Sequence, residues 1–375
     1  MFNGNGRIHA MYHLRIELPA VVTRVVVGPN ALRSIGQEIL QLFARALPPS
    51  VFVLTDDRVG PLYYPLVRES LSRAGFACDH YEIPAGEAAK ALSVAEQVYR
   101  AFVAANVSRD AVVLALGGGV VSDLAGFVAA TWMRGIRFVI CPTTLEADVD
   151  AAIGGKTGIN IPGGKNLVGA FHHPLLVAID PCCLQTLDSR DVYAGLAESV
   201  KHALISSSQF LLWHEEHAGR ILELAPDVTG ELIRQNIEIK SRIVTRDPTE
   251  QGQDRAMLNL GHTIGHAIEE CCGYAMRHGE CVSLGLVAAC RLSRSLGLLE
   301  PSTVARVEDL LTRLRLPIVL AQAIETGAIL ATLRRDKKIR QGQTRFVLLD
   351  GIGNPVIRDD IDETSIVRAY ESLLP

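Results

Sequence analysis

The sequence has 375 residues, of which 48% are hydrophobic and 21% are charged, and its formal net charge is −4. A chain of this length can form two domains, and its nearly balanced charge is atypical of a nucleic-acid-binding protein. No apolar run reaches the length of a membrane span, Met1–Arg15 lacks the apolar core of a signal peptide, and the eight cysteines include no CxxC pair. We therefore expect a cytoplasmic protein with reduced thiols, with no membrane and no nucleic acid among its partners.

The first half of the chain alternates predicted strands with predicted helices. The strands are Tyr12–Leu18, Thr23–Val27, Val51–Thr55, Asp79–Ile83, Ala111–Leu116 and Arg137–Pro142. The helices are Ala31–Ala46, Leu62–Ala74, Leu92–Ala105 and Val121–Thr131. This alternation predicts an α/β domain whose mostly parallel sheet is covered by helices on both faces.

From about Asp191 onward the pattern changes to helices. These are Arg190–Ile205, Phe210–Leu224, Gly230–Thr245, Arg255–Cys272, Glu280–Leu296 and Pro301–Leu314, followed by a short extended run at Thr344–Leu349. We therefore predict an α/β nucleotide-binding domain over residues 1–190 and a mainly α-helical domain over residues 191–375.

Three glycines, Gly117-Gly118-Gly119, follow a predicted strand and precede a predicted helix. Backbone N–H groups at such a turn can hold a pyrophosphate, although Ser122 stands where a dinucleotide fingerprint has its third glycine. The glycines alone leave open a simple strand-to-helix turn. Asp123, and Thr143-Thr144 after the next strand, add polar groups at the same sheet edge and favour a nucleotide.

The segment from Asp150 to Asn166 is rich in glycine and contains Lys156, Asn160 and Lys165. Ammonium and amide groups of this kind suit an anionic, hydroxyl-rich ligand. An exposed flexible loop is the alternative. Apolar side chains interleaved with the polar ones argue against such a loop, because we expect them to be buried: Ile153, Ile159, Leu167, Val168 and Phe171.

The second domain contains a histidine pattern that is typical of a metal site. If the helix begins near Arg255, then Arg255, Asn259, His262 and His266 share one face, and His278 lies beyond a loop. Gly261 and Gly265 would let another element pack close, and imidazoles one turn apart can converge on a first-row metal ion. A solvated helix face remains the alternative.

Glu198 and Lys201 lie three residues apart on the first predicted helix of this domain. Glu198 could supply the carboxylate of a site with two histidines and one glutamate. An exposed ion pair is the alternative that their spacing leaves open.

Taken together, these motifs resemble the 3-dehydroquinate synthase family, a branch of the sugar-phosphate cyclases. The most specific are LGGGVVSDLAGFVAATWMRG, PTTL, IGGKTGIN, GKNLVGAF, GLAESVKH, LNLGHTIGHAIE and HGE, and the resemblance extends from Gly28 to the Leu349–Asp360 region. It implies a dehydroquinate synthase-like fold, which is shared with glycerol-dehydrogenase-like metal-dependent alcohol dehydrogenases.

The resemblance also implies the ligands and their residues. A divalent metal, zinc or cobalt, would be bound by Glu198, His262 and His278. NAD would lie near Asp56, Glu87, Lys90, Gly118, Gly119, Asp123, Thr143, Thr144, Lys165 and Thr186. The catalytic residues would be Lys156, Lys201, Lys240, Arg255, Asn259 and His266, and the substrate-binding residues Asp150, Asn166, Arg134 and Lys337. Because Arg134 would reach the substrate phosphate in the neighbouring subunit, a homodimer is implied.

The implied reaction converts 3-deoxy-D-arabino-heptulosonate 7-phosphate into 3-dehydroquinate and phosphate, in the shikimate pathway of aromatic amino-acid biosynthesis. It combines transient oxidation by NAD, β-elimination of phosphate, re-reduction, ring opening and an intramolecular aldol closure, with His266 as the expected proton-transfer residue. The alternatives are a related cyclase acting on sedoheptulose 7-phosphate or an aminated substrate, a metal-dependent alcohol dehydrogenase, and a non-enzymatic nucleotide-binding module.

Two acids depart from the family pattern. Glu146 and Asp148 stand where the family usually has leucine and methionine or glutamine. Their carboxyl groups could shift the pKa values of neighbouring groups, or could point into solvent.

Overall fold

The computed structural model describes residues 11–18, 21–43, 50–162, 164–339 and 345–375. The chain divides into two compact units. The first comprises residues through Leu187 together with Thr229–Thr249, and the second comprises Asp188–Val228 together with Glu250–Pro375. The change of unit at Leu187 lies close to the boundary predicted at residue 190.

A seven-stranded sheet with the order β1-β2-β9-β6-β5-β3-β4 forms the centre of the first unit. Only β1 and β2 pair in antiparallel fashion, and the other neighbouring strands of this sheet are parallel. The strands are β1 (Tyr12–Glu17), β2 (Val22–Val27), β3 (Val51–Asp56), β4 (Cys78–Ile83), β5 (Val112–Gly117), β6 (Arg137–Pro142) and β9 (Leu176–Ile179). The predicted α/β class is confirmed, whereas the strand β9 was not predicted.

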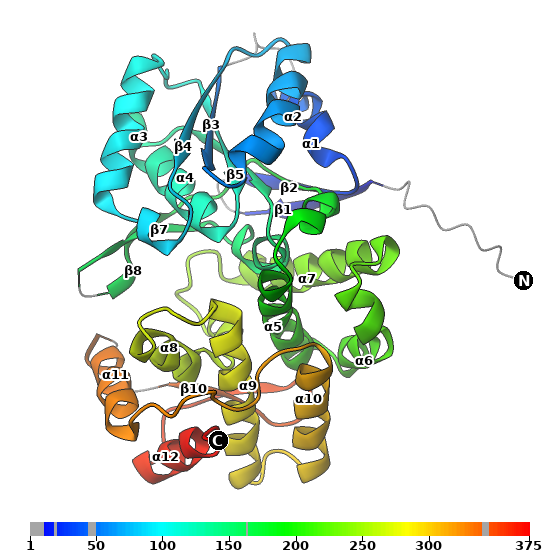
Figure 1. Ribbon diagram of the computed structural model, residues 1–375, viewed down its shortest axis with the longest axis vertical. Coiled ribbons are helices and arrows are strands. Elements are labelled where there is room, and N and C mark those ends of the chain that lie inside the picture. Colours follow the sequence, from blue (N-terminus) through cyan, green and yellow to red (C-terminus); the bar gives the residue numbers. More distant parts are fainter. Residues whose placement is uncertain (1–10, 19–20, 44–49, 163, 340–344) are drawn as a thin grey trace, which may run out of the picture. The chain divides into compact units, whose positions relative to one another are not determined.

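Helices cover both faces of this sheet (Figure 1). They are α1 (Ala31–Leu42), α2 (Gly60–Arg73), α3 (Leu92–Ala104) and α4 (Gly119–Thr131). Val53 of β3 belongs to the core cluster formed with α1 and α2, while its neighbour Phe52 meets Phe102 of α3 edge-to-face at 4.8 Å between ring centroids. Successive strand residues point to opposite faces, and helices cover both faces of the sheet. Every residue of β3 and β5 is therefore buried, which explains the uninterrupted apolar sequences of these strands.

The glycine-rich segment after β6 forms an antiparallel hairpin of β7 (Lys156–Ile161) and β8 (Gly164–Phe171), and not a flexible loop. The hairpin lies close against α4. A Cβ atom added to Gly126 of α4 would come within 2.3 Å of Thr157 Cγ2, so only glycine allows this approach. The close packing of α4 and β7 therefore fixes the position of the hairpin within the first unit.

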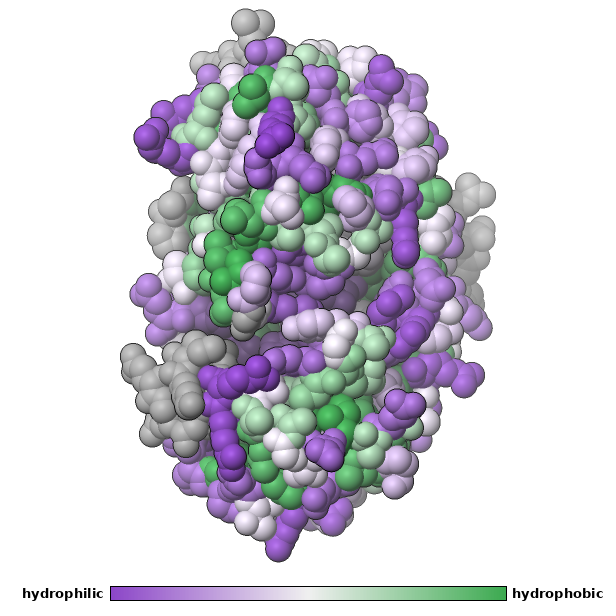
Figure 2. Space-filling model, turned by 60° about the vertical axis from the view of Figure 1, so that its left-hand side comes forward, coloured by the Kyte–Doolittle hydropathy of each residue, from purple (hydrophilic) through white to green (hydrophobic). Residues whose placement is uncertain are grey.

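The apolar residues of the hairpin region are not all buried. Ile153 and Ile159 are buried as predicted, but Leu167, Val168 and Phe171 of β8 are 54%, 38% and 43% exposed. The prediction for these three residues was wrong, because β8 pairs only with β7 and is the outer strand of a two-stranded sheet. Figure 2 brings this side of the first unit forward and shows apolar atoms gathered at its surface.

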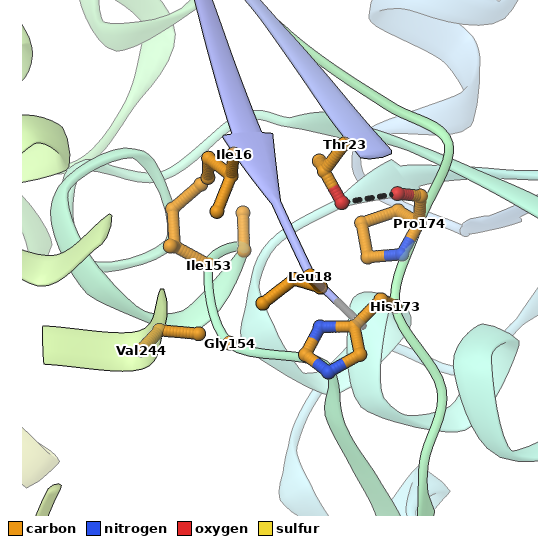
Figure 3. A pocket seen from close by; sticks show the side chains of 9 residues that line it. Ile16, Leu18, Thr23, Ile153, Gly154, His173, Pro174 and Val244 are labelled. Carbon is orange, nitrogen blue, oxygen red and sulfur yellow. Dashed lines mark hydrogen bonds between the residues drawn. The ribbon is translucent and has the colours of Figure 1, made fainter. Parts of the chain in front are cut away.

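Helix α7 (Pro226–Arg246) belongs largely to the first unit, although the sequence pattern grouped it with the helical domain. Val244 of α7 lines a small pocket together with Ile16 of β1 and Ile153 (Figure 3). An amphipathic pattern predicts that a helix buries one face, but it does not identify the core that receives this face.

The second unit is mainly helical, as predicted. Its elements are α5 (Ser189–Ser206), α6 (Ser208–Leu222), α8 (His262–Cys271), α9 (His278–Ser295), α10 (Pro301–Arg313), α11 (Thr326–Ile339), α12 (Glu363–Glu371) and the hairpin of β10 (Phe346–Leu349) and β11 (Pro355–Arg358). The predicted helix end at Ala46 and strand start at Thr344 lie outside the described residues. Within the described ranges, no helix has both the length and the apolar character needed to cross a membrane.

Candidate active site

Two histidine rings and one carboxylate meet within the second unit. The Nε2 atoms of His262 on α8 and His278 on α9 lie 3.5 and 3.4 Å from Oε1 of Glu198 on α5. Ligand atoms at zinc-binding distances of 2.0–2.1 Å are separated by about 3.3 Å at the corners of a tetrahedron. The positions of these three side chains therefore fit a single divalent ion.

His266 belongs to the same group. Its ring centroid lies 5.0 Å from that of His262 and 5.6 Å from that of His278, and the three histidines offer ligand atoms within 4.8 Å of one another. The sequence pattern placed His266 beside the metal as a proton-transfer residue. The geometry puts its ring within reach of the same ion.

Glycines allow the three helices to approach closely enough for this cluster to form. A Cβ atom on Gly285 of α9 would lie 1.8 Å from the carbonyl oxygen of Gly261, and one on Gly265 would lie 2.8 Å from that of Cys281. At the start of α9, a Cβ atom on Gly279 would lie 1.9 Å from the carbonyl oxygen of Ala194 on α5. The expectation that Gly261 and Gly265 let another element pack close is confirmed.

The predicted helix Arg255–Cys272 is interrupted. A short 3₁₀ turn spans Arg255–Asn259, and α8 begins only at His262, after Gly261 with φ +78°. Arg255, Asn259 and the histidines therefore do not lie on one continuous helical face, so that part of the prediction was wrong. A glycine was expected to weaken the helix, but the sequence did not show that this one adopts a left-handed conformation that ends it.

Glu198 and Lys201 form an ion pair inside α5, and this pair is not exposed. The two side chains are 1% and 2% exposed, and the Lys201 Nζ contacts Glu198 Oε2. The opposite carboxylate oxygen faces the two histidines. A buried charge of this kind needs partners, and Glu198 has them on both sides.

The electrostatic environment favours the protonation states that bind a metal. Burial opposes the charged form of Glu198, but Lys201 and His262 outweigh it and hold the pKa of this carboxyl well below its usual range. Burial lowers the pKa of His262, and desolvation together with the two neighbouring imidazoles lowers the pKa of His266. These shifts favour the ionised carboxylate of Glu198 and the neutral imidazoles of His262 and His266, which are the forms that metal coordination requires.

The glycine turn of the first unit leaves polar groups available to a ligand. No side chain caps the N-terminus of α4 at Gly118, so its backbone N–H groups face outward from the end of β5. The buried hydroxyls of Thr143, Ser122 and Thr55 make no hydrogen bond within the structure. An uncapped helix N-terminus beside orphaned hydroxyls at one sheet edge fits a dinucleotide phosphate.

Lys90 connects the predicted cofactor residues with a predicted substrate residue. Its Nζ donates hydrogen bonds to Asp123 Oδ2 at 2.6 Å and Asn166 Oδ1 at 2.5 Å, and lies 3.7 Å from Glu87 Oε1. Lys165 Nζ lies 3.6 Å from the same Glu87 oxygen. The structure thus brings together five of the predicted residues, which come from three separate stretches of sequence.

Asn160 belongs to this network but was not among the predicted site residues. Its Nδ2 donates to Glu87 Oε1 at 2.8 Å, its Oδ1 accepts from the Asn166 N–H at 2.9 Å, and its own N–H donates to the Lys90 carbonyl at 2.7 Å. Asn160 is the last residue of the IGGKTGIN motif, so this motif could have indicated Asn160 as a site residue.

Two further predicted cofactor residues occupy turns of the first unit. Asp56 Oδ1 accepts from the N–H groups of Arg58 and Val59 at 2.9 and 2.8 Å, which stabilises the turn after β3. The hydroxyl of Thr186 lies 2.5 Å from that of Tyr63. Thr144 contacts the glycine turn directly, since a Cβ atom on Gly118 would come within 2.9 Å of its methyl group.

The remaining predicted residues are distributed over both units. Lys240 of α7 donates to Asp150, with its Nζ 2.8 Å from Oδ1 and 2.6 Å from the backbone oxygen. Lys156 and Arg134 are exposed, and Arg255 is buried. The side chain of Lys337, near the end of α11, lies outside the described residues.

The two unusual acids differ in their surroundings. Asp148 is completely buried, so the alternative in which it points into solvent is excluded, and neither of its carboxyl oxygens has a hydrogen-bond partner. Burial, with a contribution from Asp180, raises the pKa of Asp148 well above its usual range. Glu146 is half-buried.

The pocket in Figure 3 contains none of the predicted site residues. Its lining is mostly apolar, and the hydroxyl of Thr23 already donates to the carbonyl of Pro174 at 2.6 Å. We assign no ligand to this pocket.

Comparison with known proteins identifies the family. Residues 80–194 match the family model described as 3-dehydroquinate synthase N-terminal, and residues 195–339 match the one described as 3-dehydroquinate synthase C-terminal. The 3-dehydroquinate synthase of Symbiobacterium thermophilum is 42% identical over 352 residues, which cover 93% of this chain and 97% of the relative. That of Cereibacter sphaeroides is 43% identical over 367 residues, which cover 96% and 98%.

A solved structure agrees with these relatives. The 2-epi-5-epi-valiolone synthase of Streptomyces hygroscopicus, determined with NAD+ and Zn2+ bound, superimposes with a TM-score of 0.86 at 30% identity, covering 95% of this chain and 98% of that one. Both family models, the near-complete relatives and this superposition agree with the family that the motifs indicate. The chain belongs to the 3-dehydroquinate synthase family.

Proposed function

We propose that the chain converts 3-deoxy-D-arabino-heptulosonate 7-phosphate into 3-dehydroquinate and inorganic phosphate. The observation that carries this proposal is the match to both halves of the family together with relatives that align over nearly their whole length. The reaction belongs to the shikimate pathway, which leads to chorismate and the aromatic amino acids.

The metal ligands in this proposal are Glu198, His262 and His278, with zinc or cobalt as the ion. Their mutual distances and protonation states support the assignment, and the Streptomyces relative was determined with Zn2+ bound. NAD, which that structure also contains, would lie at the glycine turn, where Gly118, Gly119 and the orphaned hydroxyl of Thr143 meet.

When bound, NAD supplies a hydride acceptor and the metal supplies a Lewis acid. The chain itself provides positive charge in fixed positions. Lys201 is held by Glu198 in the second unit, and Lys240 is held by Asp150 in the first. These ammonium groups, with the exposed Lys156, suit the carboxylate, phosphate and hydroxyl groups of the substrate.

We also propose a cytoplasmic homodimer. The exposed apolar residues of β8 support a contact with a second copy, because contiguous apolar surface is typical of interfaces. Arg134 is exposed and stands in the motif that in this family reaches the neighbouring site.

Substrate choice is the test that separates this function from its relatives. Purified protein with zinc and NAD should release phosphate from 3-deoxy-D-arabino-heptulosonate 7-phosphate and not from sedoheptulose 7-phosphate. The opposite preference would move the function to the sister cyclase, and net oxidation of an alcohol without phosphate release would indicate a dehydrogenase.

A further inference from the structure

Each of the two histidines that approach Glu198 has its second ring nitrogen engaged by an acceptor. His262 Nδ1 lies 3.1 Å from the carbonyl oxygen of Leu260, and His278 Nδ1 lies 3.2 Å from Oε2 of Glu269. A carbonyl and a carboxylate can only accept, and both contacts are shorter than the 3.5 and 3.4 Å that separate the Nε2 atoms from Glu198 Oε1, so Nδ1 is the favoured position of the single proton of each neutral ring. Both Nε2 lone pairs are then directed toward the space beside Glu198.

The position of Glu269 is unfavourable for a carboxylate unless it has such a partner. Its side chain is 7% exposed, and it lies in the last turn of α8, where the helix dipole disfavours negative charge. The next residue, Glu270, shows the ordinary alternative, because it is exposed and pairs with Arg335 at the surface.

Helical spacing explains why Glu269 reaches the cluster. His262, His266 and Glu269 follow one another at intervals of four and three residues on α8, so they form one stripe along the helix. The carboxylate at the end of this stripe meets His278, which is the first residue of α9.

We propose that Glu269 is a positioning residue that fixes the tautomer and ring orientation of His278 for metal binding. This inference rests on the metal ligands proposed above. A carboxylate on the Nδ1–H side holds the imidazole in place and raises the basicity of Nε2, and loss of such a partner typically weakens metal affinity about 10- to 100-fold.

The test is the zinc affinity of the full-length protein, measured by competition between the metal-free protein and a chromophoric chelator. Four proteins are compared: wild type, Glu269→Ala, Glu269→Gln and the control Glu270→Gln. We expect zinc affinity to fall about 10- to 100-fold in Glu269→Ala. We expect a smaller loss in Glu269→Gln, whose amide oxygen can still accept from Nδ1, and none in Glu270→Gln.

A second measurement separates positioning from a general loss of structure. The visible absorption spectrum of bound Co2+ should change in Glu269→Ala, because the spectrum reports the arrangement of the ligands, while the circular dichroism of the metal-free protein stays that of wild type. If Glu269→Ala fails to fold, the isosteric Glu269→Gln provides the comparison.

Wild-type zinc affinity and an unchanged cobalt spectrum in the Glu269 variants would overturn the inference while leaving the metal ligands in place. A wild-type protein that binds neither zinc nor cobalt would overturn the ligand assignment and this inference with it.

Discussion

At the scale of single residues, Glu198 is the centre of the proposed metal site. Its carboxylate has Lys201 on one side and the two Nε2 atoms on the other, and it is almost inaccessible to solvent. A cation bound between these groups would compensate the negative charge of the buried carboxylate. The cluster is thus arranged for charge neutralisation as well as for coordination.

Removing one ligand should separate metal binding from folding. His278→Ala leaves two of the three proposed ligands, so we expect loss of zinc after dialysis and loss of phosphate release together. Metal content by atomic absorption and the rate of phosphate release check this. His80→Ala, which removes an exposed histidine of the first unit, serves as the control. Full activity in metal-free His278→Ala would contradict the ligand assignment.

Asp148 provides a pH-dependent prediction. Its pKa in the folded protein is raised above its value of about 3.9 in an unfolded chain, so the native state holds a proton that the unfolded state releases. The free energy of unfolding therefore falls as pH rises above about 4, by about 1.4 kcal/mol per pH unit for this one proton, until the folded-state pKa is reached.

Asp148→Asn removes this proton uptake, so its stability relative to wild type should increase with pH. Urea unfolding of both proteins at about pH 6 and about pH 8 measures the difference. A difference that stays constant between these two pH values would show that Asp148 is ionised in the native protein. Asp180, which accepts backbone hydrogen bonds from Asn30 and Cys182, remains in both proteins.

At the scale of secondary-structure elements, the crossing of α8 and α9 depends on glycine. A Cβ atom on Gly285 would lie 1.8 Å from the Gly261 carbonyl oxygen, so Gly285→Ala should force the helices apart. We expect a destabilisation of about 1–3 kcal/mol and weaker zinc binding.

Gly219→Ala is the matched control for this prediction. Gly219 lies inside α6, with no atom within 4 Å of the position of an added Cβ. The same substitution there should stabilise the protein by about 0.5–1 kcal/mol. Thermal unfolding and zinc titration compare the two variants, and equal effects would contradict the packing argument.

The elements show which features a sequence can predict. The strands β3 and β5 and the amphipathic helices α1 and α10 were predicted because burial on two faces leaves an uninterrupted apolar run and burial of one helical stripe leaves a clear periodicity. The break at Gly261 was missed, because a glycine in a helical pattern does not reveal its φ. The exposure of Leu167 was missed because it depends on which strand pairs with β8.

The candidate site also contains features that the sequence predicted and features that it did not. The types and spacing of His262, His266 and His278 predicted a metal cluster, and the structure brings them together. Glu269 was not identified and Asn160 was not assigned to a site, because their roles depend on distances to residues of other elements. Spacing along one helix does not show which residues of different elements lie close together.

At the scale of the whole molecule, a second copy of the chain should complete each site. Arg134 lies in a turn where Met133, Arg134 and Gly135 all have positive φ, a strained geometry that is typical of functional positions. Arg134→Ala should raise KM for the phosphorylated substrate about 10- to 100-fold, because a hydrogen bond to a charged group contributes about 1.5–3 kcal/mol. Arg100→Ala removes only an exposed ion pair with Glu96 and should leave KM unchanged.

Mixed dimers make this prediction specific. When Arg134→Ala and His278→Ala chains are unfolded and refolded together, half of the dimers should contain one site with intact His278 and intact Arg134 of the partner subunit. At a substrate concentration well below the KM of the Arg134→Ala protein, about a quarter of wild-type activity should return in a dimer with shared sites. A mixture no more active than its separate components, in a confirmed dimer, would exclude the shared site.

A cyclase of this family should regenerate its NAD in every turnover. The most direct measurement is phosphate release from 3-deoxy-D-arabino-heptulosonate 7-phosphate with zinc and substoichiometric NAD, while absorbance at the NADH band is followed. We expect many phosphates to be released per NAD, without accumulation of NADH. Phosphate release that stops after one equivalent of NAD, with NADH left in solution, would contradict this expectation.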